Sequence, residues 1–337
     1  MGNHVTVTQA AQIFGVDRRT VKKYPYLVTL MPPPIAALDL GSNTFRLMLA
    51  EKSGLGPWAS KAVFQELPRL AEGLAPGGRL APAALDRSWQ ALEKFAAEIR
   101  AAGAQRVLAG ATMAARLAAD GPDFMAETTR RFGWESRLLS GEEEGRLTGA
   151  GVLTGLSPCP PEALIFDIGG RSTEFIFISG GVIASCRSLD LGVVGLTEAY
   201  LEAPARPAQL AAVAEAVRAG LKAFDLGGLP AEAALVGTAG AVTTMAALLL
   251  GLRDYDPNLV NNALVGRPAV AGLLAELSPL SVAGRAAAYG LHPRRADAMP
   301  AGLVLALEIM DHLNRPELVV SDNGLLEGLW LEAARNT

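Results

Sequence analysis

The sequence predicts an α/β protein in which one domain design occurs twice, with a cleft between the two copies. A buried strand, an Asp, a hydrophobic residue, a Gly and a hydroxyl-rich turn follow one another in "IAALDLGSNTFRLML" and again in "ALIFDIGGRSTEFIFI". Asp39 of the first segment matches Asp167 of the second, and Gly41 matches Gly169. Elsewhere, strand-like segments alternate with alanine-rich helical segments, which is typical of α/β layers.

The composition narrows the class of protein and its compartment. Half of the 337 residues are hydrophobic and the net charge is −4, so no overall electropositive field attracts a polyanion and any anion site must be local. We interpret Cys159 and Cys186 as reduced thiols in a cytoplasmic protein. The apolar stretches are too short or too broken to span a bilayer, and no Cys/His cluster indicates zinc.

Residues 1–34 are predicted to be an N-terminal extension. The segment "TVTQAAQIFGVDRRTVKKY" has two short helical runs around Gly15, with basic residues on the second, and resembles a helix-turn-helix that would let residues 1–30 bind DNA. We favour the alternative, an extension upstream of the true start, because Met31 precedes a proline run and the first convincing strand. We expect a first lobe at 35–139, a second at 140–301, and a return of 302–337 to the first.

Each copy of the repeated segment is predicted to be a β-hairpin whose turn binds phosphate. Glycines let backbone N–H groups approach phosphate oxygens, and an adjacent carboxylate suits Mg²⁺, held directly or through water. The predicted phosphate-binding residues are Gly41, Ser42, Asn43, Thr44, Gly169, Gly170, Arg171, Ser172 and Thr173, and the predicted metal-associated residues are Asp39, Asp167 and Glu174.

Between the two copies, a helix is predicted over 82–103 and a strand over 106–112. Arg116 then lies on a helical segment, where it is either a surface charge or, near a cleft, a bidentate phosphate ligand. In "SGEEEGRL", Ser140 and Glu143 have the spacing of a capping box, and taken alone this acidic first turn is best interpreted as solvated. The alternative is a carboxylate that takes a proton from an attacking water.

Beyond the second copy, "AALVGTAGAVTTMAALLLGL" reads as a strand, a Gly turn and a helix, followed at the end of the chain by "LVVSDNGLLEGLWLEAA" as strand, turn and helix. The turn at Gly237 and Thr238 places free N–H groups at a helix N-terminus, where an anion or a nucleotide could bind.

Together these segments resemble the exopolyphosphatase/guanosine pentaphosphate phosphohydrolase (Ppx/GppA) family, in the superfamily of actin, Hsp70 and sugar kinases. The resemblance spans residues 35–330, in the family's order, and is carried by "ALDLGSNTFRLML", "ATMAARLAADGPDF", "SGEEEGRL", "LIFDIGGRSTEF", "SLDLGVVGLTE", "VGTAGAVTTMAAL", "YDPNLV", "RRADAMPAG" and "VSDNGLLEGL". It implies two ribonuclease-H-like lobes around a phosphate-filled cleft. The chain looks like the short, two-lobed form, without the C-terminal HD-type domain of longer members.

The resemblance also implies an activity and its residues. The expected reaction is Mg²⁺-dependent removal of the terminal phosphate of inorganic polyphosphate or of the γ-phosphate of guanosine pentaphosphate, in a cytoplasmic enzyme of the stringent response. Glu144 falls on the family's catalytic glutamate, against the capping interpretation of this motif, and Arg116 on its phosphate-gripping arginine. The two turns fall on the family's two phosphate loops. A homodimer is left open, and no membrane association is expected.

Five residues depart from the family pattern, at four places in the chain. Arg171 stands where a third glycine is usual, Gly195 where many members have Arg, Ala241 where a hydroxyl residue is common, and Asn261-Asn262 where a His-Gly pair is expected. For Arg171 we favour a guanidinium that faces the cleft or lies at its edge; the alternative is an outward side chain that is a spectator or pairs with a nearby carboxylate. These departures keep two other functions open: a catalytically weak sensor of a polyphosphorylated ligand, and an actin-like ATPase or sugar kinase.

Overall fold

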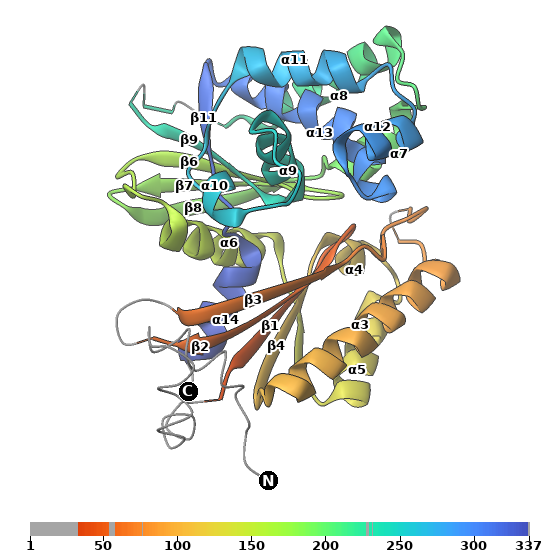
Figure 1. Cartoon of the computed structure of the whole chain (residues 1–337), viewed down its shortest axis with the longest axis vertical. Coiled ribbons are helices and arrows are strands. Elements are labelled where there is room, and N and C mark those ends of the chain that lie inside the picture. The colour runs from red at the N-terminus through yellow and green to blue at the C-terminus, as the bar shows by residue number, and fades with distance from the viewer. Residues whose placement is uncertain (1–32, 54–57, 76, 227–228, 231, 336–337) are drawn as a thin grey trace.

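The computed structural model of the chain describes residues 33–53, 58–75, 77–226, 229–230 and 232–335. These residues form two lobes, one built on a sheet of strands β1–β5 and the other on a sheet of strands β6–β11 (Figure 1). The N-terminal extension, with its predicted helix-turn-helix, lies outside the described residues.

The sheet of the first lobe has the order β3-β2-β1-β4-β5, in which β1 pairs antiparallel with β2 and parallel with β4. Its strands are β1 (Ile35–Leu40), β2 (Phe45–Lys52), β3 (Trp58–Glu66), β4 (Arg106–Ala111) and β5 (Glu135–Leu138). The lobe's helices are α3 (Pro82–Ala102), α4 (Met113–Leu117) and α5 (Gly121–Phe132). Helix α3 begins with a proline at its first position and ends at Gly103, whose φ of 69° is the left-handed conformation that glycine favours.

The second lobe repeats this topology. Its sheet has the order β10-β11-β9-β6-β7-β8, so β8-β7-β6-β9-β11 corresponds to β3-β2-β1-β4-β5 and β10 is an added edge strand. The strands are β6 (Ala163–Ile168), β7 (Thr173–Ser179), β8 (Val182–Leu189), β9 (Ala234–Thr238), β10 (Leu264–Gly266) and β11 (Glu317–Val320). The repetition confirms the predicted duplicated, ribonuclease-H-like α/β fold.

The two copies match residue by residue at their turns. The Gly41 N–H donates to the Thr44 carbonyl at 3.1 Å, and the Gly169 N–H donates to the Ser172 carbonyl at 2.9 Å. A Cβ on Gly41 would lie 2.8 Å from the Thr44 carbonyl oxygen, so this tight turn excludes a larger residue. The two hairpins differ in the charge of the residue opposite the Asp. Asp39 lies opposite Arg46 in the first copy, whereas Asp167 lies opposite Glu174 in the second.

Most helices of the second lobe pack around one apolar core on its sheet (Figure 1). They are α7 (Val193–Tyr200), α8 (Pro207–Phe224), α9 (Ala239–Leu249), α10 (Pro257–Val260), α11 (Arg267–Leu277), α12 (Val282–Tyr289) and α13 (Pro293–His312). Helix α13 is central to this core, since Leu303, Leu305 and Ile309 are almost fully buried within it.

Two helices connect the lobes, α6 (Gly141–Gly155) and α14 (Leu325–Arg335), and they pack against each other. Helix α14 also contacts β1, β2 and β4, and the indole N–H of Trp330 lies 3.2 Å from the carbonyls of Ile35 and Ala50. Because α13 and β11 belong to the second lobe, the segment that returns to the first lobe is α14, which is shorter than the expected 302–337.

The contact between α6 and α14 depends on glycine, which gives a prediction about stability. A Cβ on Gly328 would lie 1.9 Å from the Leu147 carbonyl oxygen, so Gly328→Ala forces the two helices apart. We expect it to lower the free energy of unfolding by about 3 kcal/mol, measured by urea denaturation. Gly272→Ala is the matched control, because nothing lies within 4 Å of its added Cβ, and in helix α11 it should stabilise by about 0.5–1 kcal/mol. Equal effects of both variants would contradict the packing argument.

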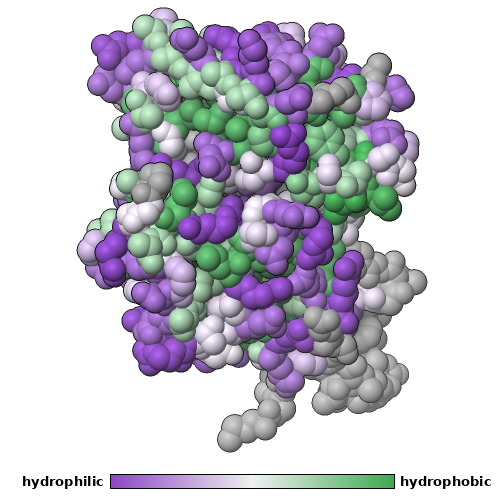
Figure 2. All heavy atoms as spheres, turned by 180° about the vertical axis from the view of Figure 1, so that it is seen from behind, coloured by the Kyte–Doolittle hydropathy of each residue, from purple (hydrophilic) through white to green (hydrophobic). Residues whose placement is uncertain are grey.

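On the face opposite to that of Figure 1, hydrophilic residues cover much of the surface, with hydrophobic residues between them (Figure 2). Within the described part of the chain, no helix has the length and apolar character needed to cross a membrane.

Candidate active site

A cleft of about 950 Å³ lies between the lobes and is lined by residues of both. The hairpin turns of the two copies meet in it, together with the start of α6, the end of β9 and the segment that leads into α14. The sequence-predicted site residues that line this cleft are Asp39, Gly41, Ser42, Asn43, Thr44, Glu144, Asp167, Gly169, Gly170, Ser172 and Thr238. Most of the predicted set is therefore brought together.

The two turns are in van der Waals contact with each other. A Cβ on Gly170 would lie 3.0 Å from the Cβ of Ser42 and 3.3 Å from the backbone nitrogen of Asn43, so a side chain at position 170 would press on the other turn. The Ser42 hydroxyl accepts a hydrogen bond from the Ala114 N–H at 3.1 Å, which fixes the first turn on the start of α4. We call residues 41–44 the first phosphate loop and residues 169–173 the second.

Glu144 lies in the first turn of α6 and is buried, with 7% of its surface exposed. Its Oε2 accepts a hydrogen bond from Arg116 Nη1 at 2.6 Å. Burial raises the pKa of the Glu144 carboxyl well above its usual value, the charge of Glu174 raises it further, and Arg116 opposes both. A buried carboxyl with a raised pKa beside a cleft has the properties of a general base.

The capping box predicted for Ser140 and Glu143 is confirmed, next to the buried Glu144. The Ser140 hydroxyl accepts from the Glu143 N–H at 3.1 Å, and the Glu143 carboxylate accepts from the Ser140 N–H at 2.8 Å, which is a complete capping box. Glu143 therefore caps the start of α6, and Glu144, one residue later, lines the cleft.

Arg116 is not among the residues that line the cleft. Its Nη1 donates to the Leu139 carbonyl at 2.7 Å as well as to Glu144, and its Nη2 contacts the sulfur of Met113. In this structure the guanidinium holds the carboxylate of Glu144 in place, instead of reaching into the space that a phosphate would occupy.

Three further carboxylates lie near the two phosphate loops: Glu174 is buried, and Asp39 and Asp167 are half-buried at the cleft. Burial raises the pKa of Asp39 to about 7, with Arg46 opposing the shift, and burial together with the charge of Asp39 raises that of Asp167 to about 7. Burial and the charge of Asp167 raise the pKa of Glu174 to about 7. Thr148 Oγ1 lies 3.5 Å from Asp167 Oδ2, and the Ser188 hydroxyl donates to Glu174 at 2.7 Å.

These carboxylates fit a Mg²⁺ ion of the kind that binds together with a phosphate substrate. No group of three or more His, Cys, Asp or Glu side chains among the described residues is arranged to hold a metal by itself. Mg²⁺ seldom needs such a cage, because it is usually bound through one or two carboxylates, with water and substrate phosphates as the other ligands. Asp39 and Asp167 both line the cleft, and the mutual repulsion between these carboxylates is the kind that a cation relieves.

Besides Arg116, four predicted residues lie outside the cleft lining: Glu174, Thr173, Gly237 and Arg171. Glu174 is buried behind the second loop, and the Thr173 hydroxyl donates to the Leu191 carbonyl at 2.7 Å. Gly237 serves packing, because a Cβ there would lie 2.8 Å from the ring of Phe166.

The cleft-facing orientation expected for Arg171 is wrong in this structure, because the side chain is not among those that line the cleft. Its φ is not in the left-handed region, so an arginine fits the turn without backbone strain. Its Nη2 donates to the Ala71 carbonyl at 2.7 Å and pairs with the Glu198 carboxylate at 2.6 Å, which satisfies the outward-facing alternative. The guanidinium is drawn away from the cleft because a carboxylate and a carbonyl are available just outside it.

The sequence reasoning missed the cationic side chains of the cleft, Arg46, Lys61 and Arg295. Lys61 pairs with the buried carboxylate of Glu327 at 2.7 Å. Burial lowers the pKa of Arg295, and the positive charge of Arg46 lowers it further. Two arginines that repel each other in one cleft favour an anionic occupant. A charged residue within the apolar run "FRLML" was the available signal for Arg46, because a buried strand carries a charge only where something pairs with it.

The Asn261-Asn262 departure has a structural explanation. Asn262 has a φ of 65°, a conformation that glycine favours and that asparagine tolerates better than most residues. Both side chains donate to the Gly155 carbonyl at the end of α6, at 2.8 and 2.9 Å, and Asn261 also accepts from the Asp322 N–H at 2.9 Å. The pair thus ties the cleft wall of the second lobe to α6.

Glycine turns that present backbone N–H groups suit phosphate oxygens, and a buried carboxylate beside them suits the activation of water. The duplicated α/β fold and the cleft together are those of an enzyme that hydrolyses phosphate bonds. Comparison with known sequences gives the family: the chain belongs to the Ppx/GppA phosphatase family, whose sequence model matches residues 64–337.

Two curated relatives and one solved structure illustrate the relationship. Exopolyphosphatase 2 of Mycobacterium tuberculosis is 31% identical, over 89% of this chain and 98% of its own length. A guanosine-5'-triphosphate,3'-diphosphate pyrophosphatase of Aeromonas salmonicida is 29% identical over 88% of this chain, and the match spans 58% of its length. The crystal structure of the Aquifex aeolicus family member superposes with a TM-score of 0.74 at 25% identity, over 90% of this chain and 98% of that one.

Proposed function

We propose that the chain removes the terminal phosphate of inorganic polyphosphate, with the γ-phosphate of guanosine pentaphosphate as the alternative substrate. The observation that carries the proposal is the Glu144 carboxylate, which lines the same cleft as the two phosphate loops and is held there by Arg116. The exopolyphosphatase relative, which this chain matches over almost its full length, supports polyphosphate as the first candidate.

In the proposed mechanism, Glu144 orients a water molecule and takes its proton as the water attacks the terminal phosphorus. The bond from that phosphorus to the bridging oxygen breaks, and orthophosphate and the shortened phosphate chain leave. The raised pKa of Glu144 suits this role, because it makes the carboxylate a stronger base than that of an exposed glutamate. Arg116 fixes the carboxylate through Nη1, and that bond restricts Glu144 to the orientation in which it faces the cleft.

The phosphate chain is proposed to lie across the two loops. Their backbone N–H groups bind the non-bridging oxygens, and Arg46 and Arg295 balance the charge of the following phosphates. Mg²⁺, held by Asp167 with Asp39 and backed by Glu174, would neutralise anhydride oxygens when it is bound. Asp167 and Asp39 are kept in place for this by the strand pairing of β6 and β1, near whose ends they lie.

Phosphate release from long-chain polyphosphate, guanosine pentaphosphate and ATP, each measured with Mg²⁺ and with EDTA, tests the proposal. We expect release from polyphosphate or guanosine pentaphosphate with Mg²⁺ only, and little from ATP. Preferential hydrolysis of ATP would favour an actin-like ATPase, and binding of polyphosphate without any turnover would favour the sensor. A cytoplasmic location and a homodimer remain predictions, and DNA binding concerns residues outside the described part of the chain.

A further inference from the structure

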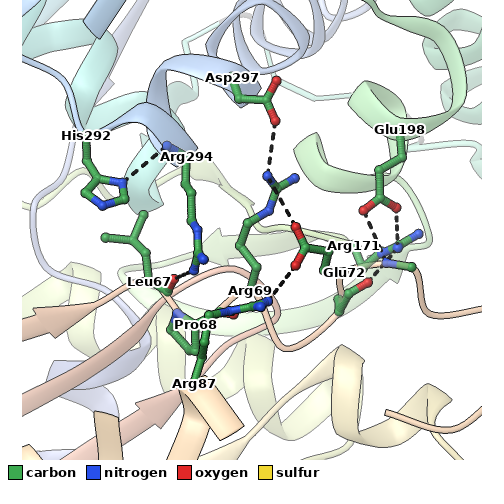
Figure 3. A network of polar contacts seen from close by, with 12 residues as sticks. Leu67, Pro68, Arg69, Glu72, Arg87, Arg171, Glu198, His292, Arg294 and Asp297 are labelled. Carbon is green, nitrogen blue, oxygen red and sulfur yellow. Dashed lines mark hydrogen bonds and ion pairs between the residues drawn. The ribbon is translucent and has the colours of Figure 1, made fainter. Parts of the chain in front are cut away.

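The side chain of Arg171 leaves the second phosphate loop and reaches the first lobe. Its Nη2 donates to the carbonyl of Ala71, which follows β3, and pairs with the carboxylate of Glu198 on α7 (Figure 3). Glu198 also approaches the first lobe, because its Oε1 accepts from the Gly73 N–H at 3.4 Å. The two side chains are 17% and 32% exposed, so the pair is shielded from much of the solvent.

The segment that Arg171 contacts is itself bonded to the first phosphate loop. The Ala71 N–H donates to the Ser42 carbonyl at 3.0 Å, and the Arg69 N–H donates to the Asn43 carbonyl at 3.1 Å. A continuous series of hydrogen bonds therefore runs from the second phosphate loop, through the Arg171 guanidinium and residues 69–71, to the first phosphate loop.

The second phosphate loop is also hydrogen-bonded to the start of helix α7. The Val193 and Val194 N–H groups at the start of α7 donate to the carbonyls of Gly169 and Gly170, at 3.0 and 2.7 Å. A Cβ on Gly192 would lie only 2.4 Å from the Arg171 backbone nitrogen, so the backbone of the second loop rests directly on the start of this helix. Since Glu198 lies on the same helix, α7 positions both the loop and the guanidinium that extends from it.

We propose that Arg171 is a positioning residue that couples the two phosphate loops across the cleft without contacting the substrate. The proposal rests on the proposed function, because it matters for catalysis only if both loops bind one phosphate chain. The coupling holds the loops in the arrangement in which each can bind phosphates at the same time.

This role predicts a specific kinetic effect. If the loops separate in the free protein, only a fraction of the molecules is ready to bind, and the apparent affinity falls by that fraction. Once a phosphate chain is bound to both loops, the arrangement around Glu144 is restored, so the chemical step is unchanged. Loss of the coupling should therefore raise KM and leave kcat nearly the same.

The test compares Arg171→Ala, Glu198→Gln and, as a matched control, Arg218→Ala. The control removes an Arg–Glu pair of the same lobe, with Glu308 at 3.0 Å, which contacts neither phosphate loop. For Arg171→Ala we expect KM for polyphosphate to rise about fivefold, with kcat changed less than about twofold. Glu198→Gln should show a smaller rise in KM, and Arg218→Ala none.

Hydrogen–deuterium exchange of the free protein provides a readout that needs no activity. In Arg171→Ala, amides in 41–44 and 69–73 should exchange faster, while those of α8 keep their wild-type rates. Unchanged exchange in both segments would overturn the proposal, whatever the kinetics. A protein without polyphosphatase activity would refute the proposed function, and the exchange would still test the coupling.

Salt dependence separates this proposal from direct binding of phosphate by Arg171. If the guanidinium bound a phosphate, the slope of log KM against log salt would become flatter in Arg171→Ala, because one ionic contact with the polyanion would be lost. The positioning role predicts an unchanged slope at a higher KM. A flatter slope, with normal exchange at 69–73, would show direct contact and overturn the proposal.

A double substitution that moves the arginine from position 171 to position 195 tests whether the guanidinium itself couples the two loops. A Cβ on Gly195 would lie 3.6 Å from Arg171 Nη1, so an arginine side chain at position 195 would begin in the space that the Arg171 side chain now fills. Position 195 is also one turn before Glu198 on α7, where an i,i+3 ion pair forms readily. The variant Arg171→Gly/Gly195→Arg should therefore recover the wild-type exchange at 69–73 and the wild-type KM. Exchange as fast as in Arg171→Ala would count against the coupling role of the guanidinium.

Discussion

Replacement of Glu144 by Gln is expected to lower kcat by about 10²- to 10⁴-fold, the range that a positioned general base contributes. Glutamine keeps the shape of the side chain and can still accept a hydrogen bond from Arg116, so α6 and the cleft should be preserved. It cannot take a proton from the attacking water. The loss should therefore appear in kcat, measured as phosphate release, while KM changes little.

The neighbouring residue provides the control for this variant. Glu143→Gln changes the same functional group one position earlier, and glutamine is also accepted at this position of a capping box. We expect near-normal kcat for Glu143→Gln and equal melting temperatures for both variants. Near-normal turnover in Glu144→Gln would mean that the base lies elsewhere. A similar loss in both variants would mean that damage to the start of α6, and not the loss of a base, reduced activity.

The part of the fold that could be predicted from the sequence is the part that local pattern determines. Asp39 and Asp167 each lie near the end of a strand of buried residues. Each is followed two residues later by a glycine, and the tight turn at that position leaves little room for a side chain. That pattern was sufficient to identify two matching hairpins and, from them, a duplicated α/β fold. It was also sufficient to place both phosphate loops in one cleft, because duplicated lobes face each other across their interface.

The roles of individual side chains were harder to predict, because they depend on partners that are distant in the sequence. Arg171 was expected in the cleft or at its edge. Its partners are Ala71, which is 100 residues away in the sequence, and Glu198 on helix α7. Gly237 was expected to bind phosphate, whereas its lack of a side chain makes room for Phe166 on the neighbouring strand. Nothing in the local sequence distinguishes these roles from phosphate binding.

The boundary of the second lobe was missed for a similar reason. The strand and helix of residues 318–334 follow the same pattern whichever lobe they join, since both lobes bury an apolar face. The structure divides them: β11 pairs with β9 of the second lobe, and α14 packs on β1 of the first. The change of lobe occurs at Ser321–Gly324, whose Asn323 and Gly324 line the cleft.

Replacement of Asp167 by Asn is expected to abolish Mg²⁺-dependent phosphate release, because it removes a negative charge from the proposed metal site while preserving the size of the side chain. A second effect concerns stability. Asp167 lies among like charges, and its ionised form is disfavoured there by burial and by Asp39. In EDTA at pH 8, the neutral amide should therefore raise the melting temperature by a few degrees.

In the wild type, Mg²⁺ should raise the melting temperature by binding to the folded state, and this rise should be lost in Asp167→Asn. Asp86→Asn is the control, since Asp86 lies exposed on α3 in the first lobe, and it should keep both the response to Mg²⁺ and the activity. Inorganic phosphate is present in the thermal-shift measurement, because the ion is expected to bind together with phosphate, and the measurement needs no turnover. If Asp167→Asn still hydrolyses polyphosphate at the wild-type rate and is still stabilised by Mg²⁺, the ion is held by other residues. Loss of activity with an intact thermal shift would assign Asp167 to the substrate and leave the ion with Asp39 and Glu174.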